Sequence, residues 1–188
     1  MDKHITAPFD KKQVEELHAG DYVYISGVIY SARDAAHKRM YDTLIENEND
    51  ASKLPIQLDG NVIYYLGPTP AREGQVIGSA GPTTSSRMDK YTPLILSKGL
   101  NGMIGKGKRS QAVIDAIVEN KAVYFAAVGG AGALLSKCIK KSEVVAYDDL
   151  GTEAIRKLRV ENFPVIVVID NQGNNLYETA VENFKKLK

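Results

Sequence analysis

Residues 22–34 predict a strand that runs directly into a helix: Tyr-Val-Tyr-Ile-Ser-Gly-Val-Ile-Tyr-Ser-Ala-Arg-Asp. The first nine of these residues are mostly β-branched and aromatic, which is typical of a well-buried strand. Ser31 and Asp34 have the spacing of a capping box, with Ser31 as the N-cap of the helix. Apolar residues then recur at a spacing of four and predict a helix with one face toward a core: Ala36, Met40 and Leu44.

The same alternation of apolar runs and helical patterns continues along the chain. Further strands are predicted at residues 62–66, 75–78, 102–105, 122–128, 144–147, 154–160 and 165–169. Helices are predicted after residue 86, where Pro93 must limit or interrupt the helix, at 110–119, and after the glycine-rich turn at 129–132. Asn171-Gln172-Gly173-Asn174 predicts a hairpin turn. Residues 1–188 are therefore expected to form a single α/β domain with a strand-rich C-terminal end.

Composition excludes several classes of protein. The chain has 188 residues, of which 24 are Lys or Arg and 23 are Asp or Glu, so its net charge is +1. It lacks the positive field that non-specific nucleic-acid binding requires, and no apolar run is long enough to span a membrane. The first residues form no secretory signal, so a cytoplasmic location is expected.

The sequence has few cysteine and histidine residues. Cys138 is the one cysteine, which excludes an internal disulfide and any site that needs several thiolates from this chain. It falls on an apolar helix face, where we expect an inert core thiol. The three histidines, His4, His18 and His37, have no metal-ligand spacing, and no metal site on this chain is expected.

Basic residues stand at three successive junctions between a predicted strand and a helix. Acidic residues are normally favoured there, because a helix N-terminus is electropositive. Arg33 follows the first strand, Thr-Thr-Ser-Ser-Arg occupies residues 83–87, and Gly-Lys-Gly-Lys-Arg-Ser occupies residues 105–110. If the strands are parallel, the three junctions lie at one edge of the sheet and form an anion pocket. The alternative is that these bases reach solvent or pair with nearby acids, as Arg87 could with Asp89.

Nucleotide-binding and esterase motifs are missing from this edge. Neither the Walker A pattern nor Gly-x-Gly-x-x-Gly is complete in the sequence, and no Gly-x-Ser-x-Gly nucleophile elbow occurs. A phosphate ligand is therefore less favoured than another small anion.

The junction sequences resemble the β region of class I iron–sulfur fumarate hydratases and tartrate dehydratases. The similarity is carried by Gly-Pro-Thr-Thr-Ser-Ser-Arg-Met-Asp at 81–89 and Lys-Gly-Lys-Arg-Ser at 106–110. Ala-Arg-Asp-Ala-Ala-His at 32–37 matches a third motif, and residues 129–131 and 160–164 also fit. The family usually has glycine where Ser86 stands, and often asparagine where Lys108 stands.

The resemblance implies a hydro-lyase that hydrates fumarate reversibly to malate, or removes water from tartrate. It also implies a mobile, swivelling β/β/α domain that closes over a partner's active site. Members of the family hold a [4Fe–4S] cluster on three cysteines. A chain with one cysteine would then be only the β subunit, and a larger cysteine-bearing α subunit would supply the cluster, in an α₂β₂ heterotetramer.

Residue roles follow from the same resemblance. Arg33, Arg87 and Lys106 would bind the carboxylates of a small dicarboxylate substrate, and three cations against two carboxylates leave one positive charge in surplus. Thr83 maps to the family's proposed catalytic base, and Thr84 would then hydrogen-bond to the substrate or to Thr83. A threonine hydroxyl is a poor base unless nearby cations and a helix N-terminus lower its pKa. Thr83 could instead be an ordinary N-cap.

Four neighbouring residues receive other roles. Asp34 and His37 are expected to orient Arg33 and the helix, and Lys108 and Arg109 to face solvent or the α subunit.

Three functions therefore remain open from the sequence: the β subunit of class I fumarate hydratase, the β subunit of L-tartrate dehydratase, and a non-catalytic, stand-alone anion-binding domain of the same fold.

Overall fold

The computed structural model describes the backbone of residues 2–127 and 132–186, and side chains as far as residue 181. Its strands are β1 (Lys3–Ala7), β2 (Tyr22–Ser31), β3 (Val62–Tyr64), β4 (Gly102–Gly105), β5 (Val123–Ala127), β6 (Ile139–Ala146) and β7 (Ile155–Ile169). Its α-helices are α1 (Lys11–Glu15), α2 (Asp34–Glu46), α3 (Thr92–Leu96), α4 (Gln111–Asn120), α5 (Gly132–Cys138) and α6 (Leu176–Lys186). Short 3-10 helices are η1 (Ala51–Lys53), η2 (Ser85–Met88) and η3 (Asp148–Glu153).

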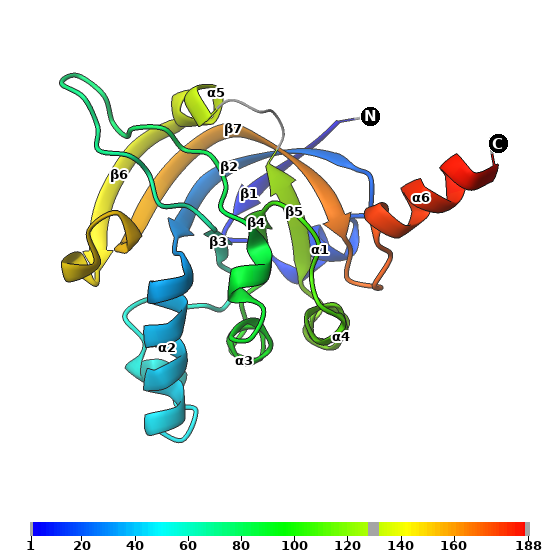
Figure 1. Ribbon diagram of the computed structural model, residues 1–188, viewed down its shortest axis with the longest axis horizontal. Coiled ribbons are helices and arrows are strands. Elements are labelled where there is room, and N and C mark those ends of the chain that lie inside the picture. The colour runs from blue at the N-terminus through cyan, green and yellow to red at the C-terminus, as the bar shows by residue number, and fades with distance from the viewer. Residues whose placement is uncertain (1, 128–131, 187–188) are drawn as a thin grey trace.

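The strands in the described part of the chain form one seven-stranded sheet, in the order β1-β2-β3-β4-β5-β7-β6. Strands β1 to β5 pair in parallel, whereas β7 is antiparallel to β5, β6 and β2. Because β7 pairs with both β5 and β2, the strands β2, β3, β4, β5 and β7 close into a ring (Figure 1). The fold is α/β, as predicted.

A bulge bends β2 and β7 where they cross. The pairing register shifts between Ile25 and Gly27, opposite Asn162, whose N–H donates to Ser26 Oγ at 3.0 Å. Gly27 has a φ of +105°, and a Cβ there would lie 2.2 Å from the carbonyl oxygen of Ala7 on β1. Only glycine fits this position, since the φ is left-handed and β1 approaches too closely for a side chain.

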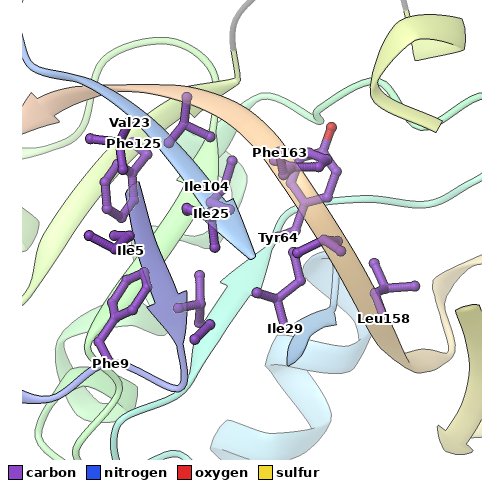
Figure 2. Packing of buried hydrophobic residues seen from close by; sticks show 14 of the residues in the cluster. Ile5, Phe9, Val23, Ile25, Ile29, Tyr64, Ile104, Phe125, Leu158 and Phe163 are labelled. Atoms are coloured by element: carbon purple, nitrogen blue, oxygen red, sulfur yellow. The ribbon is translucent and has the colours of Figure 1, made fainter. Parts of the chain in front are cut away.

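Two hydrophobic clusters lie on the two sides of the ring. The inner cluster takes residues from all five ring strands, among them Ile25, Tyr64, Ile104, Phe125 and Leu158 (Figure 2). The outer cluster lies under helices α2, α3 and α4, which stand on the same side of the sheet (Figure 1). It includes the predicted apolar stripe of α2: Ala36, Met40 and Leu44.

The predicted strand at 75–78 does not exist. These residues lie in a long loop between β3 and η2, where Val76 is 49% exposed and Ile77 is buried. Both edges of β3 are already paired, with β2 and β4, so this apolar run has no free strand edge to join there.

The C-terminal region also differs in part from prediction. The segments predicted at 154–160 and 165–169 are one continuous strand, β7. The hairpin turn predicted at 171–174 is confirmed: Ile169 and Asn175 form an antiparallel bridge across it, and Asp170 Oδ1 accepts the N–H groups of Gln172 and Asn174 at 3.0 Å. Helix α6 follows it, because Asn175 Oδ1 accepts from Tyr177 N–H and starts a helix. Residues 129–131 of the turn predicted at 129–132 lie outside the described residues.

Candidate active site

The three basic junctions meet at one rim of the ring. The first and third junctions directly follow β2 and β4. The second follows a long loop after β3 and returns to the end of that strand through the hydrogen bond from Thr83 N–H to Tyr65 O. The three strands are parallel neighbours, so their carboxyl ends lie side by side. Main-chain hydrogen bonds continue the pairing beyond the strands: Ala32 N–H donates to Tyr64 O at 3.1 Å, and Tyr65 N–H to Ile104 O at 2.9 Å. The order of the strands therefore gathers residues that are more than 70 positions apart in the sequence, such as Arg33 and Lys106.

Arg33 is the N-cap of α2 and makes no side-chain cap hydrogen bond. The predicted capping box at Ser31 is therefore wrong: Ser31 is still paired in β2, and the helix begins at Asp34. The Arg33 guanidinium lies beside Gly67, where a Cβ would come within 2.6 Å of Arg33 Cδ. Its Nε is 3.5 Å from Asp34 Oδ1 and 3.6 Å from Glu153 Oε1, so two carboxylates hold it in place.

His37 fixes the main chain of Arg33 from inside the protein. Its Nδ1 is 2.8 Å from Arg33 O, and since a carbonyl only accepts, Nδ1 carries the proton. Burial lowers the pKa of His37 from 6.5 to about 4, because the charged ring would lose its hydration, and the positive charge of Arg109 acts in the same direction. His37 is neutral at pH 7, consistent with an orienting role toward Arg33.

The second junction holds Thr83, Thr84 and Arg87. Thr83 is half-buried and its N–H donates to Tyr65 O at 2.7 Å, whereas Thr84 and Arg87 are exposed. Thr84, not Thr83, is the N-cap, and its side chain makes no cap hydrogen bond. The element that follows, η2, has only four residues, so its dipole contributes little to lowering the pKa of Thr83.

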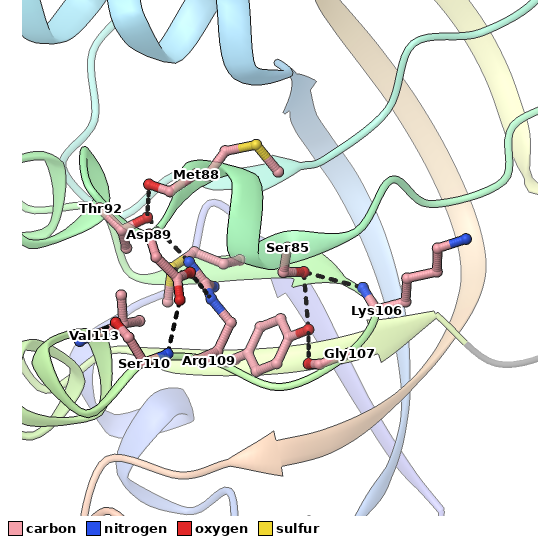
Figure 3. Close-up of polar contacts among 11 residues, drawn as sticks. Ser85, Met88, Asp89, Thr92, Lys106, Gly107, Arg109, Ser110 and Val113 are labelled. Atoms are coloured by element: carbon pink, nitrogen blue, oxygen red, sulfur yellow. Dashed lines mark hydrogen bonds and ion pairs between the residues drawn. The ribbon is translucent and has the colours of Figure 1, made fainter.

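The third junction is joined to the second through Ser85, which sequence reasoning passed over. Ser85 N–H donates to Lys106 O at 2.9 Å, and Ser85 Oγ accepts from Lys106 N–H at 3.0 Å (Figure 3). The buried Ser85 hydroxyl also contacts Tyr124 Oη at 2.9 Å. A Cβ at Gly105 would lie 2.0 Å from Ser85 Oγ, so glycine is required there. The hydroxyl run at 83–86 was the available signal for Ser85.

Lys106 itself is exposed, and its side chain extends away from Ser85 (Figure 3). Arg87 lines a hollow of about 380 Å³ together with Asp34, Lys38 and Lys90, so the first and second junctions share a surface. Lys38 and Lys90 are cations that the sequence analysis did not single out, and Lys38 is paired with Asp42. The contacts that connect the three junctions are made largely by main-chain atoms.

Arg109 was expected to face solvent or a partner, and this expectation is wrong. Its side chain is fully buried, with Nε 2.7 Å from Asp89 Oδ1 and Nη2 3.0 Å from Thr92 Oγ1 (Figure 3). The guanidinium lies over the rings of Tyr65 and Tyr124. Burial alone would lower the pKa of Arg109, but Tyr65 and Asp89 raise it above the usual value, so the charge is kept.

The Asp89–Arg109 pair clamps the second junction to the third. Asp89 Oδ2 also accepts from Ser110 N–H at 2.7 Å, just where α4 begins. The anticipated pair between Arg87 and Asp89 does not form, because Asp89 is taken by Arg109. The side chain of Arg87 therefore remains exposed to solvent.

We predict that Asp89→Asn destabilises the chain by about 3–5 kcal/mol, because it leaves a buried guanidinium without its counter-charge. Urea unfolding at pH 7.5 measures the loss. Asp42→Asn, which removes a carboxylate from an exposed ion pair, is the matched control and should change stability by less than about 1 kcal/mol. Equal effects of the two substitutions would contradict the clamp.

We also predict a pH dependence from His37. Its pKa is lower in the folded state (about 4) than the ordinary value of 6.5, so the unfolded chain binds a proton first as pH falls. Stability is therefore fully present above pH 6.5 and is lost between pH 6.5 and 4, by on the order of 2 kcal/mol at pH 5. Urea unfolding at pH 7.5 and 5.0 should show a smaller difference in His37→Gln than in the wild type. The exposed-site control His4→Gln should keep the wild-type difference, and an identical difference in all three proteins would refute the assignment.

The donors of this chain do not fit a [4Fe–4S] cluster. Cys138 is the one thiol in the sequence, and a cluster of this kind requires several thiolates. Cys138 is half-buried beside the inner cluster, and burial raises the pKa of its thiol, which disfavours the thiolate that a metal needs. The described residues contain no group of three or more His, Cys, Asp or Glu side chains placed to hold a metal ion.

Comparison with known proteins decides the family. The model of the family described as "Fumarase C-terminus" matches residues 3–180. The chain belongs to this family. It is 37% identical over 178 residues to fumarate hydratase 2 of Leishmania major, covering 93% of this chain and 31% of that protein. It is 38% identical over 172 residues to the anaerobic class I fumarate hydratase of Escherichia coli, covering 90% and 30%.

A relative of nearly the same size also matches. A protein of Methanocaldococcus jannaschii, provisionally named L(+)-tartrate dehydratase subunit beta, is 40% identical over 174 residues, covering 89% of this chain and 87% of that protein. The chain thus spans about a third of the length of the fumarate hydratases and most of the length of this subunit. The relatives of this fumarase C-terminus domain are named as enzymes that add or remove water.

In the described part of this domain, no helix is both long and apolar enough to cross a membrane.

Proposed function

We propose that this chain is the β subunit of a two-chain hydro-lyase that hydrates fumarate reversibly to (S)-malate. The observation that carries the proposal is the family match over residues 3–180, which includes every residue at the three junctions. The rim geometry supports it, since Arg33, Thr83, Arg87 and Lys106 lie at the carboxyl ends of adjacent parallel strands.

The name of one relative supports the two-chain arrangement. The Methanocaldococcus jannaschii relative, 87% of which is covered by the match, is named as a beta subunit, a name that belongs to an enzyme of more than one chain. We therefore propose a larger, cysteine-bearing α subunit as partner, in an α₂β₂ heterotetramer. The family's [4Fe–4S] cluster would be held by that subunit, since the donors of this chain do not fit it.

The substrate would be a small dicarboxylate held by the cations of the rim. Among the described residues, neither Arg87 nor Lys106 takes part in an ion pair, so both are available to an anion. Arg33 differs, because Asp34 and Glu153 offset part of its charge while they orient its guanidinium. A planar fork held in this way suits recognition of one carboxylate, and Arg87 and Lys106 would meet the other.

Thr83 would act as the base that accepts a proton from the substrate. A neutral hydroxyl accepts a proton poorly, and the four-residue η2 offers little dipole, so the cations of Arg87 and Lys106 must supply most of the stabilisation of negative charge on Thr83 Oγ1. The hydrogen bond from Thr83 N–H to Tyr65 O holds this residue at the rim. Thr84, exposed beside it, would hydrogen-bond to the substrate or to Thr83.

A second substrate has support of its own. The relative of similar length is named for L(+)-tartrate, which favours an L-tartrate dehydratase β subunit as the alternative. The reactions of fumarate and of tartrate would use the same cations and the same proton-transferring residue. An activity assay with each substrate is therefore needed to distinguish the two functions. The third alternative, a non-catalytic anion-binding domain, is tested by the same preparation.

We predict that anaerobic affinity purification of the tagged chain from its native source recovers one larger, cysteine-bearing chain in a brown complex. The complex should hydrate fumarate, whereas the separated β chain should be inactive, because it lacks the donors for a cluster. The absorption spectrum and the turnover of fumarate and L-tartrate are measured on the same sample. Turnover by the separated chain without iron would overturn the proposal, and a colourless chain without a partner under strict anaerobiosis would favour the stand-alone domain.

We predict that Thr83→Ala lowers kcat of the assembled enzyme by about 10²–10⁴-fold, the usual contribution of a proton-transferring group. Assembly and the absorption spectrum should be unchanged. Thr83→Ser, which keeps a hydroxyl, should recover much of the activity. The matched control is Thr6→Ala at an exposed position on β1, which should leave kcat unchanged. A normal kcat in Thr83→Ala would move the proton-transfer role to the partner subunit.

A further inference from the structure

Buried polar atoms without hydrogen-bond partners gather at one end of the ring. In the described residues, seven buried side-chain atoms have no partner, and five of them belong to residues next to the start of β7: Ser31 Oγ, Arg33 Nε, Asp34 Oδ1, Glu153 Oε1 and Arg156 Nε. Buried polar atoms are nearly always hydrogen-bonded, so such a concentration calls for a polar ligand or ordered water. Arg33, Asp34 and Glu153 compensate one another as ion pairs at 3.5–3.6 Å, but Arg156 makes no ion pair within the described residues.

Strand register places Arg156 at the mouth of the ring. Arg156 pairs directly with Ser31, two residues beyond the pair of Leu158 and Ile29. Residues two apart on a strand share a face, and Leu158 and Ile29 belong to the inner cluster. The side chains of Arg156 and Ser31 are therefore on the inward face, at the last position before β2 ends.

A cavity of about 310 Å³ lies at this position. Residues 68–71 and 76–78 of the loop after β3 form one wall, and η3 with Arg156 forms the other. Figure 1 shows this loop rising beside β6 and β7. The volume is at the small end of ligand pockets, which suits a small organic acid, and mouths of barrels are frequent ligand sites.

The charges of the lining favour an anionic group. The lining contains one cation, Arg156, and one acid, Asp148. Asp148 is exposed, so water screens its charge, whereas the Nε of Arg156 is buried and unsatisfied. A carboxylate in the cavity can accept from two N–H groups of the guanidinium together, and this two-point contact fixes its orientation.

We propose that this cavity binds the carboxylate of a small organic acid, with Arg156 as the residue that recognises it. The site is separate from the proposed active site, because Arg33, Thr83, Thr84, Arg87 and Lys106 do not line the cavity. It is nevertheless adjacent to it: Thr152 lines the cavity, and its carbonyl lies beside Gly67, the residue that Arg33 contacts. The proposal does not depend on the hydro-lyase assignment.

Succinate titrated into the full-length chain at constant ionic strength tests the site, with amide shifts followed by ¹H–¹⁵N NMR. The expected shifts are at Gly78, Gly151 and Thr152, and the uncharged analogue succinamide should cause none. Arg156→Gln should weaken the dissociation constant measured from these amides at least tenfold. The matched control is Arg159→Gln, an exposed arginine on the same strand, which should keep the wild-type affinity.

Three results would overturn the proposal. They are shifts confined to residues 33, 83–87 and 106, equal shifts with succinamide, and equal affinity in Arg156→Gln and the wild type. If Arg156→Gln does not fold, the amide shifts of the wild-type chain and the affinity of Arg156→Lys test the proposal. Lysine keeps the positive charge but cannot make a two-point contact, so Arg156→Lys should bind succinate more weakly than the wild type.

Discussion

Pairing of β7 with β2 is the constraint on which the other features of the structure depend. Without it, β2 to β5 would form an open sheet, and β7 would extend from its edge beside β5. With it, five strands close into a ring that encloses the inner cluster, and their ends form a rim. The closure requires a bend, which the bulge at Gly27 and Asn162 supplies. The rim, the two clusters and the cavity at its mouth all follow from one pair of bent strands.

The rim is held by two kinds of interaction with different roles. Main-chain hydrogen bonds set which residues are neighbours, as between Ser85 and Lys106. The buried pair of Asp89 and Arg109 then clamps the two segments that follow this main-chain bridge. A charged pair is suited to this because its hydrogen bonds are directional, whereas apolar contacts would let the segments slide.

Much of this arrangement could be predicted from local sequence. The apolar periodicity of β2, β4, α2 and α4 is strong, and the first and third basic junctions follow their strands, β2 and β4, directly. The second junction could not be placed this way, since a long loop separates it from β3. Arg109 could not be placed, since its burial depends on Asp89, twenty residues away, and on two tyrosines from other strands. The run at 75–78 was misread because local pattern does not reveal that both edges of β3 are occupied. The Arg156 cavity forms only when the ring closes, so no short motif could indicate it.

The main-chain character of the rim has an evolutionary consequence. Thr83 and Lys106 are held through their own N–H and C=O groups, which every residue except proline possesses. Their side chains can therefore be exchanged at little cost to stability, while a glycine such as Gly105, packed against the buried Ser85, cannot. A scaffold of this kind can acquire new specificities by single substitutions. That property accords with a family whose members carry the names of two different dehydration and hydration reactions.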